Sequence, residues 1–207
     1  MSGKGRGVFV GQYFITASVK QATFCSQPPE AGDVTTFWRQ SSRFWFAKNP
    51  AFDTFFRNRF VHMHHQILDR EHDDWLADPN GALALILMTD QYPRNAFRGT
   101  GSMYSADSLA IHYARIALKA GYPTQLEERL KLFFFLPFAH SEDLADQQIS
   151  VAFNKSLGQP WSTKAQGFME IISRFGRFPH RNAMLGRDST QEEVAFLQAA
   201  PGIAPEP

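Results

Sequence analysis

Three prolines recur at a near-constant interval in this chain. Pro93, Pro137 and Pro179 each come where a helical run of apolar residues stops, 44 residues apart from Pro93 to Pro137 and 42 from Pro137 to Pro179. A proline ends or kinks a helix, because it lacks a backbone N–H and its ring clashes with the preceding turn. A period of this size is typical of stacked two-helix units. It therefore predicts antiparallel helix pairs whose connecting loops share one edge of the stack.

Helix start and stop signals are frequent, and no alternating strand pattern bounded by turns competes with them. Asn49-Pro50 and Asp78-Pro79 pair a capping side chain with a first-turn proline, and Gly176 occupies the place of a left-handed cap. The expected fold is therefore all-α. The signals place helix starts at Asp33, Asn49, Asp78, Ser105, Thr124, Ser141, Thr163 and Thr190, and helix ends near Asp69, Pro93, Ala120, Pro137, Gly158 and Gly176.

The two ends of the chain differ from the middle. Residues 1–32 carry basic side chains but no acidic one before Glu30, without the arginine-rich amphipathic pattern of a targeting peptide. We expect a disordered or loosely attached extension there. A single all-helical domain is expected over residues 33–200, followed by a tail over residues 201–207.

Charge and composition narrow the classes of partner. The net charge is +1, which favours neither nucleic acid nor an anionic membrane surface as a partner. The longest apolar run, residues 82–88, is too short to span a bilayer. Cys25 is the single cysteine, which excludes an intrachain disulfide and indicates a cytoplasmic location. With no Gly-rich phosphate loop, we expect no cofactor.

The stretch from Ile171 to Arg187 is the most basic part of the chain. It holds four arginines and His180, with no acidic residue between Glu170 and Asp188. Because guanidinium groups need carboxylates or phosphates opposite them, Arg177 and Arg181 are candidate anion ligands. The predicted stack also brings the Pro93 and Pro179 loops to one edge, so Arg181 is expected to meet Asp90.

Asp90, Arg94 and Asn95 surround the first of the three prolines. Asp90 follows Leu83 and Leu87 on a face expected to be buried, so Arg94 or another base should pair with it. The pair fits a ligand site and a structural ion pair equally well. Asn95 and Asn182, each shortly after a proline, fit a ligand site or the satisfaction of helix-end carbonyls.

His140 begins the run His140-Ser141-Glu142-Asp143. Serine as N-cap with two acids in the first turn is explained by helix capping and the helix dipole. His140 is not, and a histidine beside carboxylates can act as an acid or base. His62, His64 and His65 are not expected to form a metal site, because helical geometry separates them and two ligands make half a site. We expect a solvated flank there instead, and no metal.

Many of these motifs also occur together in one known family. They are Phe37-Trp38, Trp45-Phe46, Phe52-Asp53, Leu83-Ala84, Asp90-Gln91-Tyr92-Pro93-Arg94-Asn95, Leu136-Pro137, His140-Ser141-Glu142-Asp143, Arg174 to Asn182 and Leu185-Gly186-Arg187. The chain closely resembles, over about residues 33–198, the bacterial family called domain of unknown function 924. The resemblance implies an all-helical fold like that of tetratricopeptide repeats, a right-handed superhelix of antiparallel pairs, and it implies no established activity. The chain departs from the family pattern at Phe168, where a histidine is usual, and in its first 32 residues.

Three functional interpretations follow. The first is an edge pocket in which Asp90, Arg94, Asn95, Arg177, Arg181 and Asn182 bind an anionic small molecule or a peptide carboxylate. The second is an acid–base or hydrolytic enzyme in which His140 or His180 transfers protons and Glu142 or Asp90 orients the ring. In the third, the polar loops only latch the edge of the stack.

Overall fold

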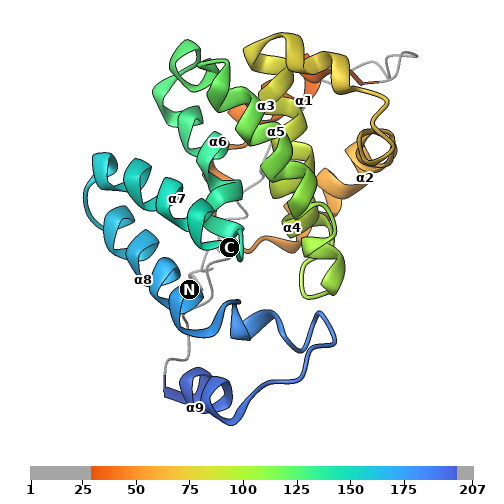
Figure 1. Cartoon of the computed structure of the whole chain (residues 1–207). Helices are drawn as coiled ribbons and strands as arrows, with labels where there is room; N and C mark the ends of the chain where they lie inside the picture. Colours follow the sequence, from red (N-terminus) through yellow and green to blue (C-terminus); the bar gives the residue numbers. More distant parts are fainter. Residues whose placement is uncertain (1–28, 200–207) are drawn as a thin grey trace, which may run out of the picture.

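The computed structural model describes residues 29–199, and all regular elements in that range are helical, as the sequence predicted (Figure 1). The helices are α1 (Ala31–Gln40), α2 (Pro50–Leu68), α3 (Pro79–Ile86), α4 (Tyr92–Ala96), α5 (Asp107–Lys119), α6 (Glu128–His140), α7 (Leu144–Leu157), α8 (Trp161–Phe175) and α9 (Gln191–Ala199). Most of the expected extension over residues 1–32, and the expected tail, lie outside the described residues. In residues 29–199, no helix is both long and apolar enough to cross a bilayer.

Helix α3 forms the centre of the core. It packs against α1, α5 and α6, and its residues from Gly81 to Ile86 are fully buried, as expected for a helix that is apolar nearly all round. Aromatic rings extend this core: Trp38 packs edge-on against Phe133 at 5.3 Å between ring centroids, and Phe56 lies 5.6 Å from Trp38. Each buried phenylalanine of this kind contributes about 1.5–3 kcal/mol through the hydrophobic effect.

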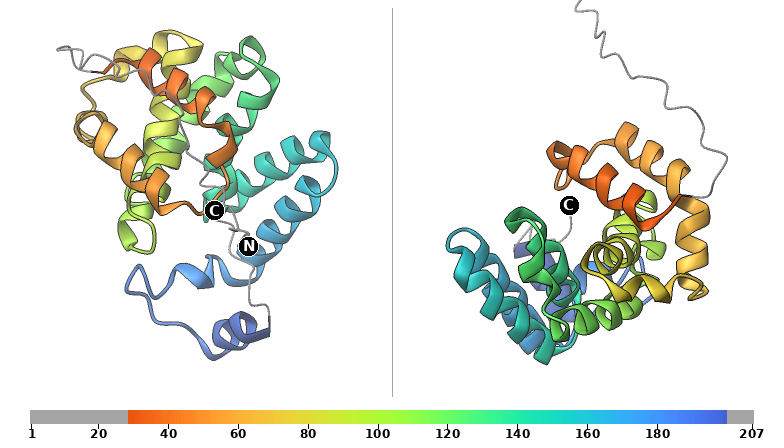
Figure 2. Two further views of the ribbon diagram at one scale, coloured as in Figure 1. Left: turned by 180° about the vertical axis from the view of Figure 1, so that it is seen from behind. Right: turned by 90° about the horizontal axis from the view of Figure 1, so that it is seen from above.

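Helices α5 to α8 follow one another as packed neighbours. Contacts join α5 to α6, α6 to α7 and α7 to α8, with α7 and α8 at one side of the molecule (Figures 1 and 2). Beyond α8 the chain runs below these helices and ends in α9, which lies apart from the core.

Several helix boundaries lie where the sequence placed them. The Asn49 and Asp78 side chains each accept a hydrogen bond from a backbone N–H in the first turn, at 3.0 and 2.9 Å. Gly176 ends α8 in the left-handed conformation, with φ of 69°. Thr190 and Glu193 exchange side chain–backbone hydrogen bonds, which is a complete capping box for α9.

Other predicted caps are wrong because the side chains bond elsewhere. The Ser105 and Thr124 hydroxyls donate to carbonyls in 3-10 turns that precede α5 and α6, so those helices begin later. Asp143, not Ser141, caps α7 by accepting from two backbone N–H groups. The remaining expected starts are also displaced, since α1 begins at Ala31 before Asp33, and α8 at Trp161 before Thr163.

The prolines do not all end helices. Pro137 lies inside α6, so the predicted end before it is wrong and the helix continues to His140. The amide of Gln147 supports this last turn by donating to the carbonyls of Phe138 and Ala139. Before Pro93 the helix widens into a π turn, Leu87–Gln91, in which the Tyr92 N–H donates to the Leu87 carbonyl five residues back. Helix α4 then carries the chain through Pro93.

The three histidines of α2 differ in environment. His62 and His65 are exposed, as expected for a solvated flank, but His64 is buried and its Nδ1 lies 3.0 Å from the Met88 carbonyl. Burial lowers the pKa of His64 to about 4, against a smaller opposing effect of that hydrogen bond. Among residues 29–199, no group of three or more His, Cys, Asp or Glu side chains is arranged to hold a metal ion.

Candidate functional site

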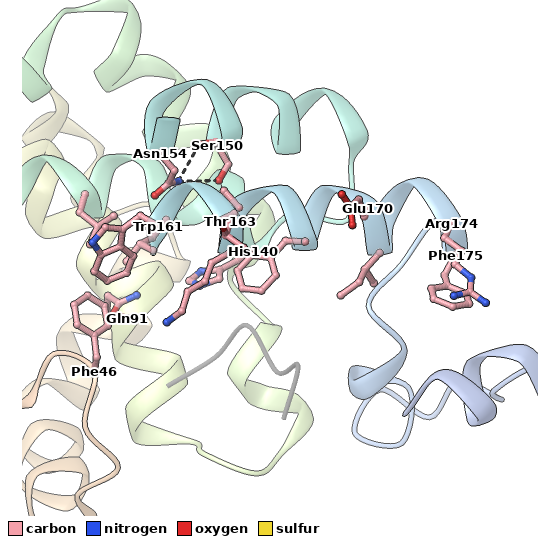
Figure 3. Close-up of a pocket in the computed structure, with 18 of the residues that line it drawn as sticks. Phe46, Gln91, His140, Ser150, Asn154, Trp161, Thr163, Glu170, Arg174 and Phe175 are labelled. Atoms are coloured by element: carbon pink, nitrogen blue, oxygen red, sulfur yellow. Dashed lines mark hydrogen bonds between the residues drawn. The ribbon is translucent and has the colours of Figure 1, made fainter. Parts of the chain in front are cut away.

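A pocket of about 750 Å³ runs along one face of α8 (Figure 3). Trp161, Ala165, Phe168, Ile171 and Phe175 line it, at spacings of three and four residues that place them on a single helical face. At 1.5 Å of rise per residue, the distance from Trp161 to Phe175 is about 21 Å. The opposite wall comes from α6, through Leu132, Leu136, Ala139 and His140, and from the loop after α1 through Phe46. The volume matches that of small-molecule sites in proteins.

The pocket has two recognisable ends and a polar middle. Phe46 and Trp161 lie at one end, with ring centroids 6.0 Å apart, and Arg174 and Phe175 lie at the other. His140 lies between these ends (Figure 3). A ligand that fills the pocket therefore passes His140.

His140 is held by a buried carboxylate. Its Nδ1 lies 2.7 Å from Oδ1 of Asp90, and the two side chains are 3% and 1% exposed. Because an ionised carboxylate only accepts hydrogen bonds, Nδ1 must carry the proton, and Nε2 is the nitrogen left for a ligand. This is the geometry in which a carboxylate fixes the tautomer and orientation of a catalytic imidazole.

Asp90 is kept ionised by its neighbours. Burial acts to raise the pKa of Asp90, but Arg94, with Nη1 at 3.2 Å, and His140 outweigh it and hold the pKa well below its ordinary value. Arg94 also makes a two-pronged ion pair with Asp107, at 2.8 and 3.0 Å. Arg181 in turn donates to Asp107 at 3.4 Å. Two carboxylates and two guanidinium groups thus alternate, with no net charge, behind His140.

The expected contact between Arg181 and Asp90 is therefore replaced by a longer connection. Asp107, at the start of α5, is the carboxylate that Arg181 contacts, and Arg94 joins it to Asp90. The Pro93 and Pro179 segments are thus linked through a third element, the start of α5. The expected Asp90–Arg94 ion pair is confirmed.

The π turn places two neighbouring side chains at this site. The amide nitrogen of Gln91 donates to Oδ2 of Asp90 at 2.6 Å, and Gln91 also lines the pocket. Its amide oxygen is buried and has no hydrogen-bond partner among the described residues. Asn95 donates to the Gln91 carbonyl at 2.8 Å, at the end of the π turn, which is a contact of the kind that its structural interpretation expected.

Glu142 has a different position from the one expected for a partner of His140. It accepts two hydrogen bonds from Arg187, at 2.6 and 2.9 Å, and one from the Phe178 N–H at 2.8 Å. Burial acts to raise the pKa of Glu142, but these donors outweigh it and lower the pKa. Glu142 thus fastens the segment after α8 to the start of α7.

Arg177 and Asn182 bind α9 rather than the pocket wall. Arg177 pairs with both oxygens of Glu193, at 2.7 and 2.8 Å, and this interaction lowers the pKa of Glu193 to about 2. Asn182 donates to the Ser189 hydroxyl and to Glu193. His180, in the 3-10 turn Pro179–Arg181, packs 5.5 Å from the Phe178 ring and is not among the residues that line the pocket.

The site thus unites His140, Asp90 and Arg94 from the predicted set, and it adds two features that were not predicted from the sequence. No sequence pattern singles out Gln91, although it directly follows Asp90 in a buried helix. The apolar face of α8 could not be predicted as a pocket wall, because apolar residues at helical spacing look the same whether they face a core or a pocket.

The chain is similar to known proteins in sequence and in structure. A family model described as "Bacterial protein of unknown function (DUF924)" matches residues 34–201. A solved structure of a protein of unknown function from Agrobacterium tumefaciens is 43% identical in sequence, with a TM-score of 0.79. The match covers 82% of this chain and 97% of that one. No curated protein matches the chain.

Proposed function

Since the chain belongs to the bacterial family of unknown function DUF924, we propose its function from its own pocket. The pocket along α8 binds an anionic small molecule, and His140, oriented by Asp90, exchanges a proton with that molecule or with a water molecule beside it. The observation that carries the proposal is the buried Asp90–His140 pair in the wall of a pocket large enough for a ligand.

The ionised form of Asp90 makes His140 useful as a base. A proton taken up at Nε2 turns the ring into a cation, and the adjacent Asp90 carboxylate stabilises that cation. Arg94 and Asp107 hold Asp90 in position, so little reorganisation is needed when the charge forms. We therefore propose that Arg94 and Arg181 support the Asp90–His140 pair. Three other residues, Arg177, Asn182 and Glu142, hold the segment after α8 in place.

The anion is expected near the cations that line the pocket. Lys164 and Arg174 of α8 line the pocket, and the carboxylate of Glu170 lines it as well. A peptide carboxylate meets the same requirement as a small organic acid, but the mostly apolar lining favours a small molecule.

The test uses the full-length protein and a pocket-filling variant. Gly167 lines the pocket, and a Cβ added there meets no atom within 4 Å. Gly167→Trp should fill the pocket, and Gly167→Ala is its matched control. In a melting-temperature screen of organic acids, phosphates and their neutral analogues, hits should raise the melting temperature of the wild type and of Gly167→Ala but not of Gly167→Trp.

Hits are then incubated with the protein, and product formation is followed by mass spectrometry. His140→Gln should still bind the hits but lose at least a hundredfold in turnover, since general acid–base catalysis contributes about 10²–10⁴-fold. Turnover that survives in His140→Gln, or hits that bind Gly167→Trp as tightly as the wild type, would contradict the proposal.

Other expectations extend this proposal. We propose that α5 to α8 correspond to a tetratricopeptide-like right-handed stack, supported by their packing as successive neighbours. We also propose a cytoplasmic location and no nucleic-acid partner, on the grounds of cysteine content and net charge.

A further inference from the structure

The positive charge of the pocket is unevenly distributed. Arg174 pairs with Glu192 at 2.7 and 2.9 Å and lies over the Phe175 and Phe196 rings. Lys164, at the other end, lies 5.4 Å from the Trp161 ring centroid and makes no ion pair among the described residues. An anionic group of a ligand is therefore best accommodated beside Lys164.

One carboxylate in the lining could oppose this assignment. Glu170 is exposed and receives a hydrogen bond from Gln166 at 3.3 Å. It follows Lys164 by six residues, which turns it roughly 120° away around the α8 axis. Glu170 therefore lies towards a different side of the helix and does not neutralise the Lys164 end.

The wall near His140 offers a hydrogen-bond acceptor. Because Nδ1 of His140 carries the proton, Nε2 of the neutral ring is an acceptor that faces a ligand in the pocket. The neighbouring Gln91 amide is not available in the same way, since its nitrogen is bound to Asp90 and its oxygen is buried. When a ligand displaces water from the pocket, an acceptor left without a partner costs about 1–3 kcal/mol, so the site favours a ligand that brings an O–H or N–H donor.

The rest of the pocket is lined mainly by apolar side chains and favours a ligand with an apolar chain. Leu136, Phe168, Ile171, Phe175 and Phe196 line it. From Lys164 to Phe175 the rise along α8 is about 16 Å. The pocket is therefore long, charged near one end and apolar over most of its length.

We infer, resting on the proposed function, that the ligand is an elongated anionic amphiphile with an internal hydrogen-bond donor. Its anionic end lies beside Lys164, its O–H or N–H faces Nε2 of His140, and its apolar chain follows α8 towards Phe175. N-acyl amino acids and hydroxylated fatty acids share this chemistry.

The experiment measures binding by titration calorimetry with full-length protein, at probe concentrations below micelle formation. One series compares N-decanoylglycine with N-decanoylsarcosine, in which a methyl group replaces the hydrogen of the N–H, and with the glycine methyl ester, which lacks the charge. A second series compares 3-hydroxydecanoate with decanoate. The series that loses more affinity when its donor is removed shows whether the ligand supplies an amide N–H or a hydroxyl O–H.

We expect at least a tenfold loss of affinity when the donor or the charge is removed. In Lys164→Met the acid and its methyl ester should bind equally, whereas Lys164→Arg should keep the preference for the acid. Equal binding with and without the donor in both series, or an unchanged charge preference in Lys164→Met, would overturn the inference.

Failure of this inference and failure of the proposed function are distinguishable. Calorimetry records binding and needs no turnover, so the ligand class stands if N-decanoylglycine binds selectively and no reaction is found. Conversely, if none of these probes binds while another compound is turned over by the wild type but not by Gly167→Trp, the inferred ligand class is wrong and the proposed function stands.

Discussion

Replacing Asp90 by asparagine tests the charge arrangement behind His140. The substitution preserves size and still offers an acceptor to His140, but it removes one of two carboxylates that balance two arginines. Breaking a buried ion pair costs about 3–5 kcal/mol. Arg94 keeps its two hydrogen bonds to Asp107, so we expect a loss near the lower limit, about 3 kcal/mol. For a chain of this size, that lowers the melting temperature by about 6–12 °C.

The effect should depend on pH in a defined direction. The pKa of Asp90 is lower in the folded protein than in the unfolded chain, where it is about 4. Its charge therefore stabilises the fold above about pH 4, and this contribution is lost as the pH falls through the folded pKa. The difference in unfolding free energy between wild type and Asp90→Asn should be constant from about pH 5 to 7 and shrink below about pH 4.

Urea unfolding followed by circular dichroism across this pH range measures both quantities. Asp74→Asn is the control, because Asp74 is exposed and a surface substitution changes stability by about 0.5 kcal/mol or less. A loss below about 1 kcal/mol in Asp90→Asn, or a difference that does not narrow in acid, would refute the reasoning.

Four further substitutions probe other parts of the fold. Gly81→Ala should destabilise by about 3 kcal/mol in urea unfolding, because a Cβ there would lie 2.1 Å from the Trp75 carbonyl oxygen; wild-type stability would show that α3 can shift. Gly167→Ala should stabilise by about 0.5–1 kcal/mol in the same assay, since an open helical glycine gains from a side chain. The wild type should lose up to roughly 3 kcal/mol between about pH 6.5 and 4 as the unfolded chain, but not buried His64, takes up a proton, and His64→Gln should flatten that slope. Glu193→Gln should speed amide hydrogen exchange in residues 188–199 and leave α3 unchanged, because Arg177 loses its ion pair.

The helical class and several helix ends were predictable because they depend on local chemistry. Asn49, Asp78 and Gly176 act within one turn of their own position, and the structure uses them as expected. Ser105 and Thr124 carry the same kind of signal, but their hydroxyls donate to carbonyls three residues back, in 3-10 turns. Sequence periodicity does not report that choice.

The candidate site was predictable only within single segments. Asp90 and Arg94 are one turn apart, so their pairing followed from spacing. The partner of His140 could not be predicted from spacing, because Asp90 and His140 are 50 residues apart in sequence and meet only through the packing of α6 on the core. Glu142 is much nearer to His140 in sequence, yet it binds Arg187 from 45 residues away.

The π turn at Leu87–Gln91 has a consequence for how this pocket can be gained or lost. A π turn holds one residue more than an α turn, so deleting a single residue such as Met88 lets the helix close as regular α. Because a π turn absorbs its extra residue locally, α3 and α4 should keep their register after the deletion, and the side chains that change direction are those of the turn itself, among them Asp90 and Gln91. Deletion of one residue from the π turn should therefore remove the polar pocket wall and leave the helices on both sides in place. The deletion variant can then serve as a reference protein that has the fold but not the site.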